Sequence, residues 1–501
     1  MSNLDHLSQS PVPCYVNGEA FKGSGSYAVK DPHSPSKTLH EVSSVTIADV
    51  PKVLEAASKS FKAWRNTPVT QRRDIFNKAV ELFKEHQGKF AGIESAETTS
   101  APGWAGFDAF LATDSRVAIV DAEMFYSVLA ESGAVATVAL RGEIATTEAG
   151  KRAFIKRCPY GTVFSMAPWN APLVLSMRSV ANPIIGGNVV ILKTSEMSPK
   201  TQLTLAQLFH DAGLPAGVLN VIHVDPKDAP AVVEAIIAHD SVGKVNFTGS
   251  TQVGAIIAAT AGKHIKPVVL ELGGKAPAIV CHDADLKTAW NAIAFGGWFH
   301  SGQICMATQT VIAHESIADE LLQLLNKHKP NVTAAGEGAP LRGLFTEASA
   351  QRVKGIIDDA VSKGAKIAIG DAKVDGNVVQ PSILKDVTPE MQIYRTEMFA
   401  PVFSLITFKD EEEAIRIAND HEYGLSASIY SKDVNRALSL ADEIDSGAVH
   451  INGASVADGA AHPHGGWKKS GFGRFNGIEG IREFTQLKTV TINEPHGQYP
   501  I

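Results

Sequence analysis

Hydrophobic residues in the middle of the chain gather in short continuous runs that alternate with amphipathic stretches. The continuous runs predict buried strands over residues 161–166, 188–192, 218–224, 244–247, 268–272 and 278–280. Residues 199–212 and 251–261 have the apolar spacing of helices, and Gly213 and Pro215 follow the first of them as typical helix-end residues. Strands that alternate with helices predict an α/β fold with a mostly parallel sheet covered on both faces.

The rest of the chain carries two further patterns. A second α/β stretch runs from about residue 284 to residue 446. The closing segment 482–493, REFTQLKTVTIN, alternates polar and apolar residues as an exposed strand does. Because an unpaired exposed strand of this length promotes aggregation, we expect it to pair with another element or another subunit. No Ser-, Gly- or Pro-rich linker and no internal repeat divides the chain.

Composition and charge place the chain among ordinary globular proteins. Of its 501 residues, 44% are hydrophobic and 20% are charged, and 46 Lys and Arg against 53 Asp and Glu give a net charge of −7. A mildly acidic chain without a basic block binds nucleic acids and anionic membranes poorly, so neither is expected as a partner. The apolar stretches stop short of the about 18 residues that indicate a transmembrane helix.

Cysteine use and the chain ends predict the compartment. The four cysteines make no C-x-x-C pair and no disulfide framework: Cys14, Cys158, Cys281 and Cys305. Residues 1–13 lack the basic and apolar regions of a signal peptide, and the final tripeptide is not a retention or peroxisomal sequence. We therefore expect a reducing compartment and a cytoplasmic protein.

Two segments carry groups suited to nucleophilic chemistry. Cys305 follows the glycine of a G-Q-I-C segment, where it is either a nucleophile or a buried small hydrophobic residue. A working cysteine needs a cation, a base or a helix N-terminus nearby, because a free thiol is only a few per cent thiolate at neutral pH. Asn170 lies between Pro168 and Pro172, and its amide either donates to an oxyanion or satisfies its own turn.

Carboxylates follow two of the predicted strands. Glu271 ends an apolar run before a double-glycine bend, and a buried carboxylate is costly unless it is paired or functional. It is therefore either a catalytic carboxylate or the partner of Lys275 in a structural salt bridge. Lys193 and Glu196 follow another strand, where they either contact a nucleotide ribose or form a solvated loop.

Two further segments, one rich in glycine and one containing two histidines, have residue types that can bind a phosphate or a metal ion. Residues 247–254, FTGSTQVG, form a strand, a glycine turn and a helix start, which either bind a phosphate or make an ordinary strand-to-helix turn. His462 and His464 have a spacing that metal ligands can adopt, but no third ligand is evident. We expect loop histidines there and no metal.

The order of these motifs resembles the aldehyde dehydrogenase superfamily. The resemblance rests on PWN at 168–170, LKTSE at 192–196, FTGSTQVG at 247–254, ELGGK at 271–275, GQIC at 302–305, EMFAP at 397–401 and PHGGWKKSGFGR at 463–474. It covers about residues 15–491 and implies a Rossmann-type cofactor domain, an α/β catalytic domain and a bridging β-arm. The implied divisions are 1–140 with 158–271 for the cofactor domain, 272–482 for the catalytic domain, and 141–157 with 483–501 for the arm and tail strand.

The resemblance also implies a mechanism. Cys305 is the nucleophile that attacks the aldehyde, and Asn170 with the Cys305 backbone N–H forms the oxyanion hole. Hydride loss leaves a thioester, and Glu271 is the general base that activates water to hydrolyse it. We expect burial to raise the pKa of Glu271. The presence of Glu271 favours water over coenzyme A as the acyl acceptor.

The implied cofactor is NAD, with NADP possible, because Glu196 matches the form usually associated with NAD. Eight residues are implied to bind it. Lys193 and Glu196 hold the adenosine ribose, and Gly249, Ser250 and Gly254 line the pyrophosphate turn. The nicotinamide and its ribose are contacted by Trp169, Glu397 and Phe399. Tail strands of the implied kind extend a neighbour's sheet, so a homodimer or homotetramer is expected.

The substrate expectation rests on a narrower resemblance, to salicylaldehyde and vanillin dehydrogenases. Segments 97–108 and 451–464 and the position of Arg178 are similar to that branch. Trp104 and Phe107 either form flat walls for an aromatic ring or pack their own helix, and Arg178 can attract a hydroxyl or acidic substituent. An aromatic aldehyde is expected. Alternatives are an aliphatic aldehyde or semialdehyde dehydrogenase, a coenzyme A-dependent enzyme, a thiol esterase, and an inactive protein that keeps the fold.

Overall fold

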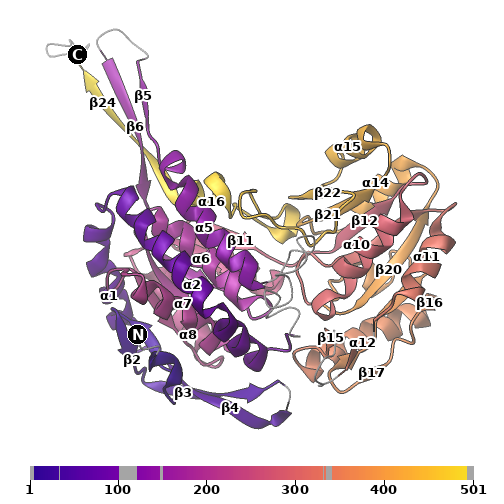
Figure 1. Ribbon diagram of the computed structural model, residues 1–501, viewed down its shortest axis with the longest axis horizontal. Helices are drawn as coiled ribbons and strands as arrows, with labels where there is room; N and C mark the ends of the chain where they lie inside the picture. The colour runs from indigo at the N-terminus through magenta and orange to yellow at the C-terminus, as the bar shows by residue number, and fades with distance from the viewer. Residues whose placement is uncertain are drawn as a thin grey trace.

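In the computed structural model, which describes residues 5–32, 34–100, 121–146, 151–330, 332–333 and 341–493, two lobes lie side by side (Figure 1). The first lobe is built on an eight-stranded sheet in the order β2-β1-β9-β8-β7-β10-β11-β23. These strands are β1 (Cys14–Val16), β2 (Glu19–Phe21), β7 (Thr162–Met166), β8 (Val189–Lys193), β9 (Leu219–Ile222), β10 (Val242–Thr248), β11 (Val268–Glu271) and β23 (Gly471–Phe472).

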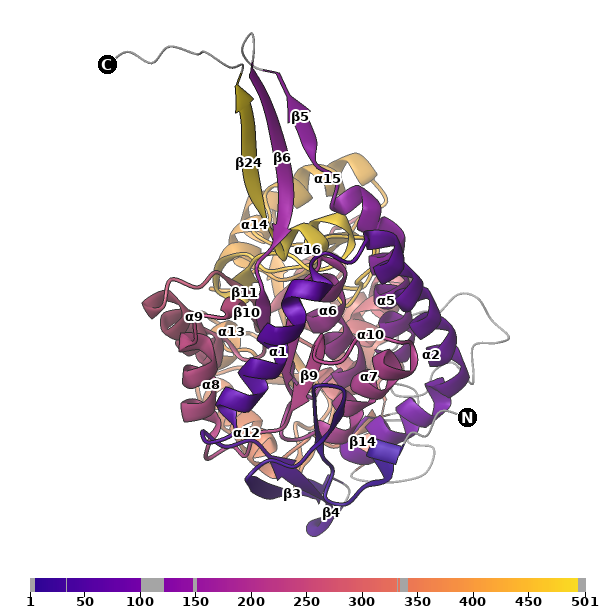
Figure 2. The same ribbon diagram turned by 90° about the vertical axis from the view of Figure 1, so that its left-hand side faces the viewer.

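Helices cover both faces of this sheet (Figure 2). One face packs against α1 (Val50–Trp64), α8 (Ala229–Ala238) and α9 (Thr251–Lys263). The other packs against α6 (Pro172–Ile185) and α7 (Pro199–Asp211), with α2 (Val69–Glu97), α5 (Asp121–Ala139) and α16 (Gly477–Glu483) outside them. Because both faces are covered, strands such as β7 are buried along their whole length and read as continuous apolar runs.

The order of the strands in this sheet places a possible ligand site at one of its edges, beyond the carboxyl ends of β7 and β10. From β7 the chain passes outward to β8 and β9, then returns to β10 on the other side of β7 and continues to β11, with all these pairs parallel. The direction of winding therefore reverses between β7 and β10. In open α/β sheets, ligands bind beyond the carboxyl ends of the strands at such a reversal.

The second lobe holds a seven-stranded sheet in the order β16-β19-β20-β13-β12-β21-β22, parallel except for β16. Its strands are β12 (Ala276–Val280), β13 (Thr308–His314), β16 (Lys366–Ile369), β19 (Ser382–Lys385), β20 (Val402–Phe408), β21 (Ala427–Tyr430) and β22 (Val449–Ile451). Its helices are α10 (Leu286–Trp298), α11 (Ala318–Lys327), α12 (Glu347–Ser362), α13 (Gln392–Arg395), α14 (Glu411–Asn419) and α15 (Val434–Asp442).

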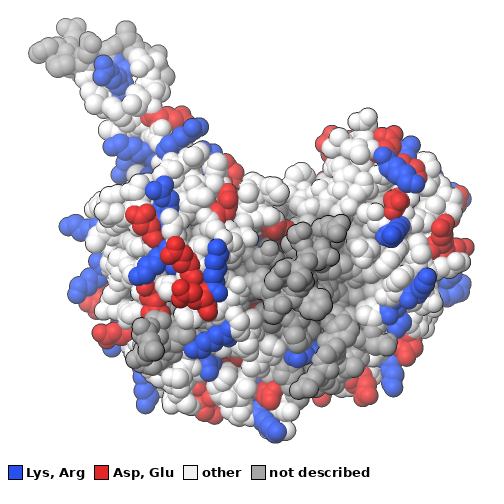
Figure 3. Space-filling model, viewed as in Figure 1, with Lys and Arg blue, Asp and Glu red and all other residues white. Residues whose placement is uncertain are grey.

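Smaller elements complete the described part. They are the hairpin β3 (Gly25–Asp31) and β4 (Ser34–Ser44), the pairs β14 (Val332–Thr333) with β15 (Leu341–Arg342) and β17 (Val374–Asp375) with β18 (Val378–Val379), and the short helices η1 (Asp5–Ser8), η2 (Phe299–Gly302) and η3 (Lys468–Ser470). No helix among the described residues is long and apolar enough to cross a membrane. On the face seen in Figure 3, acidic and basic side chains are interspersed over both lobes.

A three-stranded antiparallel arm projects from the first lobe (Figures 1 and 2). It consists of β5 (Glu143–Ala145), β6 (Lys151–Pro159) and β24 (Thr485–Asn493), with β6 in the middle. The predicted tail strand is confirmed, and it pairs with β6 from Thr485 opposite Pro159 to Asn493 opposite Lys151. Apolar side chains on the arm remain open to solvent in the single chain, such as Ile144, at 70% exposed, and Leu487, at 63%.

The elements predicted from periodicity are confirmed, and their ends differ from the predicted ones by a few residues. The runs at 161–166, 188–192 and 268–272 become β7, β8 and β11, and the stretches at 199–212 and 251–261 become α7 and α9. One pairing crosses the division expected from sequence. β23 lies within the range assigned to the catalytic domain, yet it pairs with β11 at the edge of the first sheet. The domain limits themselves remain a prediction.

Candidate active site

The carboxyl ends of three strands of the first sheet meet the second lobe at one place. Beyond β7 the chain turns through Trp169 and Asn170 into α6, beyond β10 it turns through Gly249 into α9, and β11 ends at Glu271. These segments line a cleft together with Cys305 and other residues of the second lobe. The winding reversal between β7 and β10 thus lies where the two lobes face each other.

Cys305 is presented by a strained bend between α10 and β13. Three consecutive residues before it have left-handed backbone angles: His300 with φ 49°, Ser301 with φ 54° and Gly302 with φ 70°. A Cβ at Gly302 would lie 2.2 Å from the carbonyl oxygen of Ala400, so only glycine fits there. This bend directs the segment carrying Cys305 toward Glu271, and Cys305 Sγ lies 3.8 Å from Glu271 Oε1.

The pKa of Cys305 lies well above its ordinary value of 9.0. Burial is the main cause, and the carboxylates of Glu271 and Glu397 add to it, while Arg178 acts in the opposite direction. At neutral pH the side chain is therefore a thiol rather than a thiolate. A thiol becomes a nucleophile only when a base takes its proton, and the Glu271 carboxylate is in contact with the sulfur.

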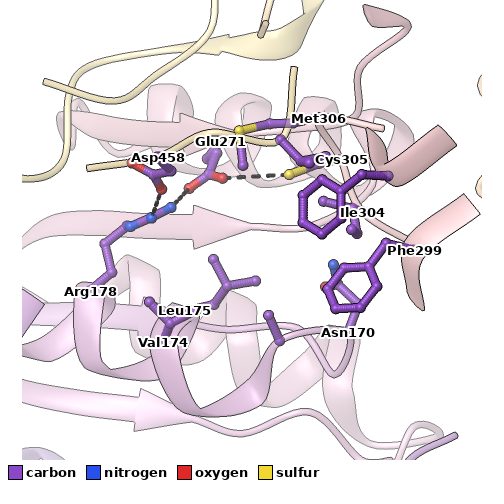
Figure 4. Close-up of a pocket in the computed structure, with 13 residues that line it drawn as sticks. Asn170, Val174, Leu175, Arg178, Glu271, Phe299, Ile304, Cys305, Met306 and Asp458 are labelled. Atoms are coloured by element: carbon purple, nitrogen blue, oxygen red, sulfur yellow. Dashed lines mark hydrogen bonds and ion pairs between the residues drawn. The ribbon is translucent and has the colours of Figure 1, made fainter. Parts of the chain in front are cut away.

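Glu271 is buried and held by two side chains that can carry a positive charge, Arg178, which Figure 4 shows, and His464. Arg178 Nη1 lies 3.2 Å from Glu271 Oε2, and His464 Nε2 lies 3.1 Å from Glu271 Oε1. Burial raises the pKa of Glu271, but the charges of Arg178 and His464 outweigh it and lower the pKa from 4.5 to about 2. The expectation of a burial-raised pKa is therefore wrong, because the neighbouring cations stabilise the carboxylate.

The alternative partner considered for Glu271 is also wrong. Lys275 does not reach Glu271, since its Nζ donates to Gln309 Oε1 at 3.4 Å. Burial lowers the pKa of Lys275 to about 7, although Glu397 opposes this. The ion pair of Glu271 is with Arg178, which comes from α6 and lies 93 residues away in sequence.

Asp458 completes a group of four buried ionisable side chains. Arg178 Nη2 donates to Asp458, and His464 Nδ1 lies 3.7 Å from Asp458 Oδ1. Burial lowers the pKa of His464, but Asp458 and Glu271 outweigh it, so the net shift is upward from 6.5. Sequence reasoning did not identify Asp458 and treated His464 as a loop histidine. Both residues lie in segments that carry the resemblance, but no local pattern indicates that they contact Glu271 and Arg178, because these partners lie far away in the chain.

Asn170 lies beside Cys305 at the start of α6. Its Nδ2 donates to the backbone carbonyl of Gln303 at 3.1 Å, which fixes the amide between the two lobes. A side-chain amide has two N–H groups, so one remains to donate to a ligand. Gln303 is a further positioning residue that sequence reasoning missed, since its Oε1 also accepts from the backbone N–H of Phe345 at 2.9 Å.

An apolar pocket opens on one side of Cys305 (Figure 4). Its hydrophobic lining comes from both lobes: Ala171, Val174, Leu175, Phe295, Phe299, Ile304, Met306 and Val456. Phe295 and Phe299 stack with their ring centroids 4.8 Å apart. Arg178 lines the same pocket, as expected, but it is engaged by Glu271 and Asp458. Trp104 and Phe107 lie outside the described residues.

A second, wider cleft opens on the other side of Cys305. It is lined by five of the residues assigned to the cofactor: Trp169, Gly249, Ser250, Glu397 and Phe399. The rings of Trp169 and Phe399 meet edge to face with centroids 6.0 Å apart. Burial raises the pKa of Glu397 to about 7, although the N–H of Gly274, which donates to Glu397 Oε1 at 3.0 Å, opposes this.

The other three residues assigned to the cofactor do not line this cleft. Lys193 and Glu196 lie at and beyond the carboxyl end of β8, the strand next to β7. Lys193 Nζ donates to the backbone carbonyl of Thr194 at 3.0 Å. A Cβ at Gly254 would lie 2.3 Å from Leu272 Cδ2, so this glycine lets α9 approach the end of β11.

Known proteins resemble this chain over almost its whole length. The sequence model of the aldehyde dehydrogenase family matches residues 20–490. A vanillin dehydrogenase from a Pseudomonas species is 40% identical over 495 residues, which are 98% of this chain and 99% of that protein.

Solved structures give the same picture. A salicylaldehyde dehydrogenase from Pseudomonas putida complexed with salicylaldehyde matches with a TM-score of 0.91 at 36% identity, covering 98% of this chain and 99% of that one. A point mutant of betaine aldehyde dehydrogenase from Staphylococcus aureus in complex with NAD+ matches with a TM-score of 0.89 at 27% identity, covering 97% and 98%.

Proposed function

Because this chain belongs to the aldehyde dehydrogenase family, we propose that it oxidises an aromatic aldehyde to the carboxylic acid with NAD as the hydride acceptor. The family and the α/β fold implied by the motifs are confirmed, and the protein is an aldehyde dehydrogenase. The observation that carries the finer proposal is that the apolar pocket and the wide cleft share Asn170, Leu175, Glu271 and Cys305. A substrate and a cofactor therefore have separate entrances to one sulfur atom.

The first half of the reaction uses the three residues around that sulfur. Glu271 takes the proton of the Cys305 thiol, because the carboxylate is ionised and touches the sulfur. The sulfur then attacks the aldehyde carbon, and the free N–H of Asn170 stabilises the oxyanion that forms. The aldehyde hydrogen leaves as hydride and the acyl group remains on Cys305 as a thioester.

The second half is hydrolysis of the thioester. Glu271 first releases the thiol proton to solvent, and a water molecule then passes a proton to Glu271 as the water oxygen bonds to the acyl carbon. The C–S bond then breaks, and the proton returns from Glu271 to the sulfur, so the acid is released and the thiol is restored. Glu271 therefore serves both halves, and its place beside the sulfur supports both.

The wide cleft fits a dinucleotide. The N-terminus of α9 opens on it through Ser250, Thr251 and Gln252, and free backbone N–H groups at a helix start favour an anionic pyrophosphate. Gly249 and Gly273 leave room at the same edge, since a Cβ at Gly273 would lie 2.5 Å from Glu397 Oε2. When bound, NAD supplies the hydride acceptor. Trp169, Glu397 and Phe399 would hold its nicotinamide end.

NAD is proposed as the preferred cofactor, with NADP as an alternative. Lys193 and Glu196 would contact the adenosine ribose beyond β8, and a carboxylate there repels a 2′-phosphate. Gly254 would support the pyrophosphate turn by allowing the close approach of α9.

The aromatic preference rests on the pocket and on the relatives. Stacked Phe295 and Phe299 with aliphatic neighbours offer a flat apolar lining. The Nε–H of buried Arg178 has no hydrogen-bond partner among the described residues, so it can donate to a hydroxyl or acidic group on a ring. The vanillin and salicylaldehyde dehydrogenases that resemble this chain are named for such aldehydes. Trp104 and Phe107 remain proposed as further pocket walls.

We also propose a homodimer or homotetramer in the cytoplasm. The apolar side chains left open on the arm favour contact with a second copy. The four cysteines of the chain are free in the structure, which suits a reducing compartment.

The test measures NAD reduction by the purified protein with substituted benzaldehydes and with short and long aliphatic aldehydes. We expect the benzaldehydes to give the highest kcat/KM and Cys305→Ala to give none. Faster reduction with aliphatic aldehydes would overturn the aromatic preference. Ester cleavage without any cofactor reduction would favour a thiol esterase.

A further inference from the structure

His464 is a buried titratable side chain to which the mechanism above gives no role. It is 5% exposed and lies in the segment between β22 and η3. Its backbone is fixed by two hydrogen bonds with Phe475, at 3.0 Å and 2.8 Å. The following strand β23 pairs with β11, placing Gly471 opposite Glu271. Main-chain hydrogen bonds therefore fix the backbone of His464 at a position from which its imidazole reaches Glu271.

We propose that His464 is a positioning residue for Glu271, which holds the carboxylate against Cys305 and sets the pH dependence of thioester hydrolysis. The inference rests on the proposed function, because it assigns Glu271 as the base of that step. His464 itself does not contact Cys305 in the described structure, so it acts through Glu271.

The geometry around the two carboxylate oxygens supports this role. Oε2 of Glu271 is 3.2 Å from Arg178 Nη1, and Oε1 is 3.1 Å from His464 Nε2 and 3.8 Å from Cys305 Sγ. A glutamate side chain has several rotatable bonds, and one cation alone leaves the carboxylate free to rotate about that contact. Contacts from α6 on one oxygen and from His464 on the other fix both, with Oε1 facing the sulfur.

Charge gives His464 its second effect. The groups that face it are Glu271 from β11, Asp458 from the preceding loop, Arg178 from α6 and His450 from β22. With a neutral His464 and His450, the buried group has one cation and two anions. Protonation of His464 balances these charges, and burial of unbalanced charge is costly, so the imidazolium is favoured.

The two protonation states of His464 act differently on the base. As an imidazolium it donates to Glu271 with full charge and weakens the carboxylate as a proton acceptor. When His464 loses its proton, Glu271 becomes more basic while remaining in place. Transfer of a water proton to Glu271 becomes easier, so hydrolysis is expected to speed up as the pH rises through the pKa of His464.

The test compares two substitutions at His464 with a matched control. His464→Phe removes both ring nitrogens, and His464→Gln keeps a side-chain N–H donor but cannot titrate. His462→Phe changes an exposed histidine of the same loop that has no contact with Glu271. Two assays are run over a pH series. The first uses p-nitrophenyl acetate without cofactor and measures the initial release of p-nitrophenol, which reports acylation, and the steady-state rate, which reports hydrolysis. The second uses mass spectrometry to measure the fraction of acyl-enzyme during benzaldehyde turnover with NAD.

We expect His464→Phe to slow hydrolysis by about 10- to 100-fold, a part of the full contribution of a general base. Acyl-enzyme accumulates in this variant. The rise in hydrolysis above the ordinary histidine pKa of 6.5 disappears in both variants, and His464→Gln recovers much of the rate at the low-pH end. His462→Phe keeps the unchanged profile.

The proposal is overturned if His464→Gln keeps the rising pH limb of the unchanged protein, a result that stands even if His464→Phe does not fold. It is also overturned if both His464 variants lose acylation and hydrolysis to the same extent and still show the rise in hydrolysis rate with pH. That result would indicate that His464 has only a structural role. A protein that reduces no cofactor with any aldehyde refutes the proposed function, while the ester assay still reports on His464.

Discussion

Glu271 Oε1 lies 3.8 Å from Cys305 Sγ, although the two residues belong to different lobes. Glu271 ends β11 in the first lobe, and Cys305 follows the strained bend before β13 in the second. The contact places an ionised carboxylate beside the sulfur, where it can accept the thiol proton as the sulfur attacks an aldehyde. It also means that the proposed catalytic pair exists only when the two lobes are docked.

Glu271→Gln tests that contact with almost no change in size. The amide cannot accept the thiol or water proton, so we expect aldehyde turnover to fall by about 100- to 10,000-fold. The assay is NAD reduction with a benzaldehyde substrate. Glu320→Gln, at an exposed position of α11, is the control and should behave as the unchanged protein. Undiminished turnover in Glu271→Gln would contradict the assignment of this residue as the base.

Arg178→Met tests the buried ion pairs. Removal of the guanidinium leaves Glu271 and Asp458 buried without their main cation, and breaking such a pair costs about 3–5 kcal/mol of unfolding free energy. The measurement is urea-induced unfolding at neutral pH. The double variant Arg178→Met with Asp458→Leu removes one of the stranded anions and should recover part of the loss. Equal destabilisation in both variants would show that packing rather than charge sets the cost.

The shifted pKa of Glu271 predicts how stability varies in acid. A carboxyl group whose pKa is lowered from 4.5 to about 2 on folding stabilises the folded protein fully above pH 4.5, and that stabilisation is lost as the pH falls toward 2. The contribution is on the order of 3 kcal/mol. Urea unfolding of the unchanged protein and of Glu271→Gln between about pH 5 and pH 3 should converge as the pH falls. Parallel curves would show that Glu271 is not linked to folding in this way.

His464 predicts the opposite trend at higher pH. Its pKa is raised above 6.5 on folding, so its stabilising effect is complete below 6.5 and is lost as the pH rises through the raised value. The stability difference between the unchanged protein and His464→Gln should therefore shrink as the solution becomes more alkaline. Thermal unfolding followed by circular dichroism across neutral pH measures it, and a difference that grows with pH would contradict the charge arrangement around this residue.

The arm predicts an oligomer. Val490 and Ile492 lie two residues apart on the same face of β24, and both are exposed in the single chain. If a second copy covers them, Val490→Asp with Ile492→Asp should shift the protein to a smaller species in sedimentation or light scattering. Val434→Asp, an exposed apolar position on α15, should leave the mass unchanged. A monomeric unchanged protein would refute the expected homo-oligomer.

Local patterns in the sequence were sufficient to predict the elements and the candidate catalytic residues. Apolar runs and helical spacing reflect burial in each segment, which is local, so β7, β8, β11, α7 and α9 were predicted close to their observed ends. The order of the motifs predicted Cys305, Glu271 and Asn170 as catalytic residues, and the structure brings these three side chains to the junction of two pockets.

The electrostatics around Glu271 depend on tertiary contacts that no local pattern contains. Residue patterns show that Glu271 is buried, and burial alone predicts a raised pKa. Its real partners come from segments far along the chain: Arg178, 93 residues away, and His464, 193 residues away. Coulomb energies depend on the distance between charges in space. The pairing of β23 with β11 and the packing of α6 beside them set those distances. As a result, the pKa of Glu271 is lowered rather than raised.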